Sequence, residues 1–594
     1  MPIDFRNTNS VWASILVETL HCLGLTTAVI CPGSRSTPLT IAFAQHEPIE
    51  AIPVLDERSA AFFALGMARQ TGKPTALVCT SGTASANFYP AVIEARASRV
   101  PLLVLTADRP PELRDCNAGQ TIDQQKLYGS YPNWYGELAV PSIDLPMLAY
   151  LRQTLIHAWE RTLHPIPGAV HLNLPFRDPL APILQPETLN LATAFSPEEF
   201  FAAIDRNQES GIREPELEGQ DQKLEIIPPP SPFPLPPSSF PPSDRPILIA
   251  GVAQSRSPKA YCEAIAHLSK TLGLPVLAEG LSPVRNYADL NPYLISTYDL
   301  ILRNPTLAET LTPDWVIRIG EMPTSKVLRQ WLARSQPLQW VIDPGDRNLD
   351  PLHLKTTHLR LSVEQFAASL SNQFVISSAY LSQWCDAEET ARRSIDQVLS
   401  QTETLFEGKV AWLLSQHLPN GTPLFIANSM PVRDVESFWK PGNRSIQPLF
   451  NRGANGIDGT LSTAIGIAHR QQSSVLLTGD LALLHDTNGF LLRNKLVGHL
   501  TIVLINNNGG GIFEMLPIAQ FDPPFEEFFA TPQSIDFSKL CATYDVPHEL
   551  IQSWEQLIQR LNPLPTDGIR VLEVRCDRKA DARWRQRFLA TTIF

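Results

Sequence analysis

Residues 474–515, SVLLTGDLALLHDTNGFLLRNKLVGHLTIVLINNNGGGIFEM, carry the pattern that decides the fold of this chain. One apolar run, 475–477, stops shortly before Asp480, and a second, 502–505, stops just before Asn507. Two such runs joined by a helix-like crossover of this length favour neighbouring parallel strands. Parallel neighbours would bring Asp480 and Asn507 to the carboxyl edge of one sheet, where open α/β sheets bind ligands.

The residue types at this edge suit a divalent cation and a phosphate group. A carboxylate and a carboxamide oxygen are ligands that Mg²⁺ accepts while it keeps other positions for phosphate oxygens and water. The run Gly509-Gly510-Gly511 allows the backbone to approach those phosphates closely. An ordinary turn at a strand end, followed by a polar loop, would also explain these residues.

Length and composition set the broad class of the protein. The chain has 594 residues, of which 43% are hydrophobic and 18% are charged, which is typical of a soluble globular protein of three or four domains. Its net charge of −12 disfavours a nucleic-acid binder that relies on a basic surface. The sequence contains no run of about 18 apolar residues and no secretory leader pattern, so neither a membrane span nor secretion is expected.

The eight cysteines are scattered, without a C-x-x-C pair or zinc-like spacing. They are most simply reduced thiols of a cytoplasmic protein.

The first part of the chain reads as repeated strand–turn–helix units, which predict a doubly wound parallel sheet. Expected strands lie at 28–31, 52–55, 76–79, 102–105 and 169–174. Polar residues follow several of these strands, including Ser34-Arg35 and Asp56-Glu57. Helix capping and the helix dipole explain an acid such as Glu57 without any chemistry, and Arg35 could be an ordinary solvated loop residue.

The domain organisation follows from composition along the chain. Residues 226–243, IIPPPSPFPLPPSSFPPS, are rich in proline and predict a linker, with a PxxP recognition ligand as the alternative. We therefore predict an α/β domain at 1–190, a linker at 191–245, a central α/β domain at 246–375 and a third α/β domain at 376–594. Further strands are expected at 247–251, 275–277, 315–320 and 340–343 in the central domain and at 424–427 in the third. The central domain lacks G-x-G-x-x-G after its first strand, so no dinucleotide site is predicted there.

The Gly-Asp…Asn-Asn spacing resembles the diphosphate-binding motif of thiamine diphosphate enzymes, with Leu481 where that motif usually has glycine. The chain also contains two α/β units in which polar residues follow the strands at an edge where a ligand could bind. Together these features make nearly the whole chain similar to the pyruvate-decarboxylase-like superfamily. The resemblance implies three doubly wound parallel-sheet domains, of which the first holds the aminopyrimidine and the third the diphosphate. It also implies thiamine diphosphate and Mg²⁺ or Mn²⁺ as cofactors.

Six segments in order narrow the resemblance: PGSRSTPL, DERSAAFFALGMAR, TSGTASANFYPAVIEA, LTADRPPELRDC, NRGANGIDGTLSTAIG and NNNGGGIFEMLP. They are similar to the thiamine diphosphate synthases of menaquinone and phylloquinone biosynthesis. That family implies decarboxylation of 2-oxoglutarate and addition of the succinyl carbanion equivalent to isochorismate, with release of CO₂.

The resemblance also implies roles for individual residues. Glu57 would hydrogen-bond the aminopyrimidine and promote its imino tautomer, while Asp480, Asn507 and the carbonyl of Gly509 would bind the metal. Ile457 would support the bent cofactor and Phe513 would line the pocket. Both substrates are dianions, for which arginine forks are suitable partners. The expected substrate-binding residues are Ser34, Arg35, Arg109, Gln120, Ser429, Arg433 and Arg452.

Two positions depart from relatives, since Gly119 stands where some carry Asn and Gly511 where some carry Gln. The resemblance further implies a homodimer or a dimer of dimers with sites at the subunit interface. Two alternatives remain open, namely another thiamine diphosphate decarboxylase or carboligase of the acetohydroxyacid synthase type, and a catalytically silent thiamine-binding protein. The arginine-bearing PGSRSTPL and TADRPPE stretches count against the first, and retention of Glu57, Asp480 and Asn507 against the second.

Overall fold

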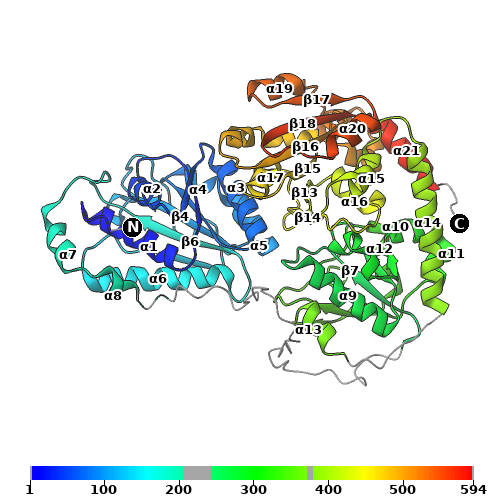
Figure 1. The fold of residues 1–594 in the computed structure, drawn as a ribbon, viewed down its shortest axis with the longest axis horizontal. Coiled ribbons are helices and arrows are strands. Elements are labelled where there is room, and N and C mark those ends of the chain that lie inside the picture. Colours follow the sequence, from blue (N-terminus) through cyan, green and yellow to red (C-terminus); the bar gives the residue numbers. More distant parts are fainter. Residues whose placement is uncertain (1–2, 203, 205–242, 371–378, 591–594) are drawn as a thin grey trace. The chain divides into compact units, whose positions relative to one another are not determined.

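The computed structural model describes residues 3–202, 204, 243–370 and 379–590, and contains three six-stranded parallel sheets flanked by helices (Figure 1). The predicted α/β fold class is confirmed. The described residues form two compact units. The first unit lies within Met1–Gln222, Asn451–Gln471 and His485–Gly498, and the second within Lys223–Phe450, Gln472–Leu484 and His499–Phe594. The predicted domain boundaries stay a prediction, and most of the proline-rich segment lies outside the described residues.

The first unit contains a sheet with the strand order β2-β1-β3-β4-β6-β5. Its strands are β1 (Thr27–Ile30), β2 (Glu50–Pro53), β3 (Thr75–Cys79), β4 (Leu102–Asp108), β5 (Trp134–Glu137) and β6 (Ala169–Pro175). Its helices are α1 (Thr8–Cys22), α2 (Thr37–Ala44), α3 (Glu57–Thr71), α4 (Thr83–Ala86), α5 (Tyr89–Ser98), α6 (Leu145–Leu163), α7 (Leu189–Ala194), α8 (Pro197–Phe201) and α17 (Thr460–Ala468). Figure 1 shows α1 and α6 on one side of this sheet and α3 and α5 on the other.

Two sheets belong to the second unit, with orders β12-β11-β10-β7-β8-β9 and β14-β13-β15-β16-β18-β17. The strands of the central sheet are β7 (Pro246–Ala250), β8 (Val276–Ala278), β9 (Leu294–Ile295), β10 (Trp315–Ile319), β11 (Leu338–Ile342) and β12 (Lys355–Leu359). Those of the C-terminal sheet are β13 (Pro423–Ile426), β14 (Gln447–Leu449), β15 (Ser474–Gly479), β16 (His499–Asn506), β17 (His548–Ile551) and β18 (Gly568–Arg575).

The helices that follow these strands cover both sheets of the second unit. They are α9 (Pro258–Leu272), α10 (Tyr298–Ile301), α11 (Pro305–Thr310), α12 (Lys326–Ser335), α13 (Val363–Ala368), α14 (Ala379–Gln401), α15 (Glu407–His417), α16 (Met430–Phe438), α19 (Phe537–Thr543), α20 (Trp554–Leu561) and α21 (Arg578–Ala590). The crossover from β15 to β16 was predicted as one helical segment. The structure instead divides it into α18 (Asp480–His485) and the 3₁₀ segment η6 (Thr487–Asn494), with Asp486 between them.

Every predicted strand is present, but the sequence did not reveal β5, β9, β12, β14, β17 and β18. All six lie at or next to a sheet edge without a long apolar run, and β9 has only two residues. An edge strand has a neighbour on one side only, so its pairing depends on tertiary contacts more than on its own composition.

Helix α3 crosses α17 at unusually close range, and glycine permits the approach. A Cβ placed on Gly66 would lie 2.1 Å from the carbonyl oxygen of Thr463, and one placed on Gly466 would lie 2.1 Å from that of Phe63. Asp56 caps the start of α3 by accepting a hydrogen bond from the Ser59 amide at 2.9 Å. The crossing therefore attaches the helix that begins at Glu57 directly to α17.

At the carboxyl edge of the central sheet, the backbone bridges the point where the strand order reverses. Val252 and Glu321, which follow β7 and β10, form an antiparallel bridge across the point where the strand order reverses. A Cβ on Gly251 would lie 1.9 Å from the Glu321 carbonyl oxygen, so glycine is needed for this contact. In other open α/β sheets this reversal point is the usual ligand crevice, and here the backbone fills it.

Among the described residues, the structure contains no helix long and apolar enough to span a bilayer. All eight cysteines are free.

We predict that Gly66→Ala lowers the thermal unfolding midpoint. The added methyl group meets a backbone carbonyl, and overpacking of this kind costs about 1–3 kcal/mol, against a gain in helix propensity of about 1 kcal/mol at most. Differential scanning calorimetry of the two proteins measures the change. The control is Gly442→Ala, because a Cβ there would meet no atom within 4 Å. An unchanged midpoint for Gly66→Ala would show that the helix crossing can relax.

Candidate functional site

The C-terminal sheet presents Asp480 and Asn507 at its carboxyl edge, as predicted. Strands β15 and β16 pair in parallel with Leu477 opposite Val503, and the two polar residues follow their ends. The Asp480 carboxylate accepts hydrogen bonds from the amides of Leu481, at 2.7 Å, and Gly509, at 2.8 Å. These bonds hold the loop after β16 against the start of α18.

The carboxyl group of Asp480 is buried, with 5% of the residue exposed. Burial raises its pKa to about 6, although the amides of Gly509 and Leu481 act in the opposite direction. No cation of the protein appears among the principal influences on this pKa. A buried carboxyl group in such surroundings favours a bound cation, which would stabilise its charged form.

Asn507 has one defined side-chain hydrogen bond, and that bond sets its orientation. Its Nδ2 donates to Oε2 of Glu407 at 3.0 Å. The carboxamide oxygen lies on the other side of Cγ and therefore turns away from Glu407. Sequence reasoning missed Glu407, since an acid in the first turn of a helix is common and nothing in the sequence relates it to Asn507.

The backbone has room for a ligand directly before Asp480 and is crowded at Gly509. A Cβ on Gly479, directly before Asp480, would meet no atom within 4 Å. Gly509 has φ +137°, and a Cβ there would lie 2.4 Å from the Ala530 carbonyl oxygen. No group of three or more His, Cys, Asp or Glu able to hold a metal occurs in the described part of the chain. A metal at this edge would therefore use one carboxylate, one carboxamide and main-chain oxygen, and the residues fit that set.

Three further predicted residues belong to the same unit. Ser429 follows β13, next to β15 where the strand order reverses, and has the unusual φ of +72°. Arg433, on α16, donates from Nη1 to the Ser429 carbonyl oxygen at 2.6 Å. Phe513 lies in the 3₁₀ turn after the glycine run, with its ring centroid 5.8 Å from that of Phe529.

The first unit gathers Arg35, Arg109 and Gln120 around the carboxyl ends of its central strands. The Arg35 amide donates to Oγ1 of Thr80 at 3.2 Å, which joins the loops after β1 and β3. Arg109 donates to Oγ of Ser81 at 2.9 Å, and Nε2 of Gln120 donates to the Ser81 carbonyl oxygen at 2.9 Å. Ser81 therefore contacts both Arg109 and Gln120. The sequence did not single out Ser81, because the turn after β3 contains several polar residues.

The electrostatics of Arg35 indicate an anion site. Burial lowers its pKa, and the neighbouring guanidinium of Arg109 lowers it further. Asp178, whose Oδ1 lies 3.7 Å from Nη1 of Arg35, acts in the opposite direction. The Nε of Arg35 is buried without a hydrogen-bond partner among the described residues. Two close cations and an unpaired donor are an arrangement that a carboxylate ligand would stabilise.

Two more predicted residues of the first unit lie at strand ends. Ser34 is exposed in the loop after β1. Glu57 is the first residue of α3 and is half-buried. Its negative charge helps to raise the pKa of the buried Cys31 thiol, although desolvation is the larger cause. The carboxyl group of Glu57 therefore lies close to the end of β1.

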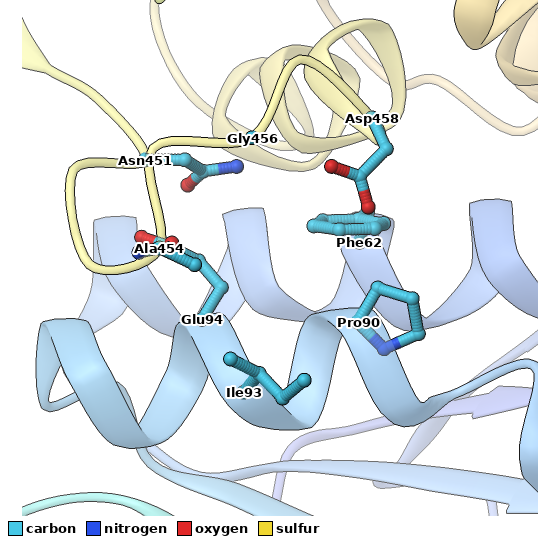
Figure 2. A pocket seen from close by; sticks show the side chains of 8 residues that line it. All are labelled: Phe62, Pro90, Ile93, Glu94, Asn451, Ala454, Gly456 and Asp458. Carbon is cyan, nitrogen blue, oxygen red and sulfur yellow. Dashed lines mark hydrogen bonds between the residues drawn. The ribbon is translucent and has the colours of Figure 1, made fainter.

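Arg452 and Ile457 lie in the loop 451–458, which the first unit holds by a buried acid. Glu94 of α5 is 3% exposed and accepts hydrogen bonds from the amides of Gly453, at 3.0 Å, and Ala454, at 2.7 Å. Figure 2 shows the loop passing over the helices, with Glu94 beneath Ala454. A cavity of about 170 Å³ lies under the loop, lined by Phe62, Pro90, Ile93, Glu94, Asn451, Ala454, Gly456 and Asp458.

Comparison with known proteins first gives the class. Residues 12–127 match the model "Thiamine pyrophosphate enzyme, N-terminal TPP binding domain", and residues 243–426 match "Middle domain of thiamine pyrophosphate". With three parallel sheets and the polar edge described above, these matches define a thiamine pyrophosphate enzyme.

Relatives of nearly the same length narrow that class. The 2-succinyl-5-enolpyruvyl-6-hydroxy-3-cyclohexene-1-carboxylate synthase of Nostoc sp. is 66% identical over 99% of this chain and 98% of its own. The synthases of Trichormus variabilis, at 65% over 99% and 98%, and of Trichodesmium erythraeum, at 62% over 100% of both chains, are similar. The chain belongs to the 2-succinyl-5-enolpyruvyl-6-hydroxy-3-cyclohexene-1-carboxylate synthase family.

We predict that Glu94→Gln loosens the loop 451–458. The glutamine keeps one acceptor oxygen but presents an NH₂ group to the other backbone amide, so a buried donor loses its partner at a cost of about 1–3 kcal/mol. Hydrogen exchange followed by mass spectrometry should show faster exchange in peptides that cover Gly453 and Ala454. Glu112→Gln, which removes an exposed ion pair with Arg177, is the control. Equal exchange in wild type and Glu94→Gln would contradict the role of Glu94.

Proposed function

We propose that the protein catalyses thiamine diphosphate-dependent decarboxylation of 2-oxoglutarate and adds the succinyl carbanion equivalent to isochorismate. The products are 2-succinyl-5-enolpyruvyl-6-hydroxy-3-cyclohexene-1-carboxylate and CO₂, in the pathway to menaquinone or phylloquinone. The observation that carries this proposal is the 66% identity, over 99% of the chain, to a relative named for that product. The eight free cysteines are consistent with action in a reducing compartment, and we place the protein in the cytoplasm.

The arginines of the first unit supply what dianionic substrates require. Arg35 and Arg109 provide two guanidinium groups near one another, and the unpaired Nε of Arg35 is a donor available to a carboxylate. Ser34 and Gln120 complete the proposed substrate site in this unit. Arg452 of the first unit and Ser429 and Arg433 of the second are further proposed substrate contacts.

The proposed cofactor residues have separate tasks. Asp480, Asn507 and the Gly509 carbonyl would hold the divalent metal, with Ile457 and Phe513 against the organic part of the cofactor. Glu57 would hydrogen-bond a nitrogen of the aminopyrimidine ring and hold the proton there. Thiamine diphosphate supplies an electron sink that accepts the electron pair left when CO₂ departs.

A thiamine diphosphate carboligase with monocarboxylate substrates, such as an acetohydroxyacid synthase, is the second candidate. Such substrates need fewer fixed cations than Arg35 and Arg109 together supply. The arginine pair therefore favours the dianionic substrates.

We further propose a two-fold dimer that shares its sites between subunits. Each compact unit carries exposed apolar side chains beside its proposed cofactor residues. Leu55, two residues before Glu57, is 67% exposed, and Phe521 and Phe528, which follow the glycine run, are 62% and 70% exposed. Exposed apolar groups next to a functional loop are typical of surfaces that bind another protein. A second copy of the chain is the proposed partner.

The function is tested by product analysis and by Glu57→Gln. With thiamine diphosphate, Mg²⁺, 2-oxoglutarate and isochorismate, mass spectrometry should detect the adduct, and CO₂ should form in equal amount. Glu57→Gln should fold and bind cofactor nearly as wild type does, but lose about 10²–10⁴-fold in decarboxylation rate, because proton transfer contributes that much. Activity within a few-fold of wild type would remove Glu57 from the mechanism. An adduct formed from pyruvate, and none from 2-oxoglutarate, would favour the second candidate.

Sharing of sites is tested by complementation between Glu57→Gln and Asp480→Ala, each expected to be inactive alone. In a mixed dimer with shared sites, one site carries both changes and the other carries neither. Activity should therefore return to about half of wild type per mixed dimer. Subunit exchange is verified by native mass spectrometry of differently tagged chains. If exchange occurs and no activity returns, each chain builds its own site.

A further inference from the structure

A buried ion-pair network lies behind Asn507, and it begins on the C-terminal helix. Nη2 of Arg585, on α21, donates to Oε1 of Glu407 at 3.0 Å and also bonds Oδ1 of Asp434. Oδ2 of Asp581, on the same helix, accepts from the Glu407 amide at 3.2 Å. Arg585, Glu407, Asp434 and Asp581 are all buried. This network is remote in sequence from the residues proposed to hold the metal.

Aromatic rings fix the cation of this network in place. The guanidinium carbon of Arg585 lies 5.0 Å from the ring centroid of Phe406 and 5.3 Å from that of Phe438. Cation–π contacts of this kind restrict the position of the guanidinium group. Arg585 thus presents its donors to Glu407 from a fixed point, so that Oε1 of Glu407 is engaged and Oε2 is left for Asn507.

A second arginine of α21 supports the same loop. Arg578 donates from Nη1 to the Asn508 carbonyl oxygen at 3.0 Å and from Nε to Oε1 of Glu514 at 2.9 Å. It therefore holds the backbone on the C-terminal side of Asn507. The main chain of the loop and the side chain of Asn507 are both supported from one helix.

The chemistry of Glu407 decides which end of the Asn507 carboxamide faces it. A carboxylate only accepts hydrogen bonds, so it selects the NH₂ group of the carboxamide and excludes the oxygen. We propose that Glu407, held by Arg585, is a positioning residue that directs the Asn507 carbonyl oxygen to the bound divalent metal. This inference rests on the proposed function, in which Asn507 is a metal ligand.

The conservative change Glu407→Gln makes a specific prediction. Arg585 needs an acceptor, so the glutamine turns its oxygen to Arg585 and its NH₂ group to Asn507. Two NH₂ groups then meet, and Asn507 relieves the conflict by rotating its carboxamide, which replaces the oxygen at the metal position by NH₂. Loss of a residue that orients a metal ligand typically lowers metal affinity about 10–100-fold, and we expect a loss in this range.

The polarity of the pair can also be exchanged. In the double variant Glu407→Gln with Asn507→Asp, the glutamine NH₂ donates to the aspartate, which presents an oxygen to the metal in either rotamer. We expect the double variant to recover most of the affinity lost in Glu407→Gln. A role of Glu407 in packing alone would predict further loss, because two buried residues are then changed.

The experiment measures binding of Mn²⁺ by electron paramagnetic resonance and of thiamine diphosphate by calorimetry, on the full-length protein. The control is Asp434→Asn, which alters the same network without touching Asn507 and should leave Mn²⁺ affinity within a few-fold of wild type. Near-ultraviolet circular dichroism verifies folding. If Glu407→Gln does not fold, the same pairing is tested by comparing the double variant with Asn507→Asp alone. Asn507→Asp should bind Mn²⁺ more weakly than the double variant, because its aspartate faces the Glu407 carboxylate without a donor between them.

The outcomes separate this inference from the proposed function. Unchanged Mn²⁺ affinity in Glu407→Gln, an equal loss in Asp434→Asn, or absence of recovery in the double variant would each overturn the role of Glu407. Asp480→Ala serves as the reference for the site itself. If Asp480→Ala binds Mn²⁺ and thiamine diphosphate as wild type does, the metal site is wrongly assigned and the inference fails with it. If Asp480→Ala loses both ligands while Glu407→Gln keeps them, only the positioning role fails.

Discussion

The close crossing of α3 and α17 is the contact on which the first unit depends. At Gly66 and Gly466 the backbone of each helix reaches the other, so neither position has space for a side chain. Helix α3 begins at Glu57, and α17 follows the loop that carries Arg452 and Ile457. Because the backbones are in direct contact, the two segments cannot shift independently. Residues far apart in sequence thereby acquire a fixed relation within one unit.

The first and C-terminal sheets share one strand order and the central sheet has another, but each sheet has a point where the strand order reverses, and the three use that point differently. In the first sheet the loops after β1 and β3 meet there through Arg35 and Thr80, and the C-terminal sheet presents Asp480 beside the loop after β13. In the central sheet the bridge between Val252 and Glu321 closes the same position. Fold alone therefore does not create a site. The residues that follow each strand decide whether the edge stays open to a ligand.

A network of buried charges lies in the second unit. Three acids surround Arg585, and burial raises the pKa of Asp434 well above its usual value and that of Asp581 to about 7. Such groups are costly to desolvate, and breaking one pair typically costs about 3–5 kcal/mol. Packed apolar residues at these positions would avoid this desolvation cost. Orientation of Asn507 through Glu407 gives a physical reason for this network at this place.

The sequence by itself determined the parallel α/β class, the main strands and the placement of Asp480 and Asn507 at the same sheet edge. Apolar periodicity and the residues at strand ends are local signals, so a single sequence contains them. Resemblance of motifs added the cofactor and the substrates. Only the tertiary structure revealed Ser81 beneath Arg109, Glu94 under the loop 451–458, and Glu407 behind Asn507. Each of these is an ordinary polar residue of a turn or helix, and its role arises from a partner many residues away. Hydrogen bonds between distant segments leave no periodic signal in a single sequence, so only the tertiary structure could reveal these three roles.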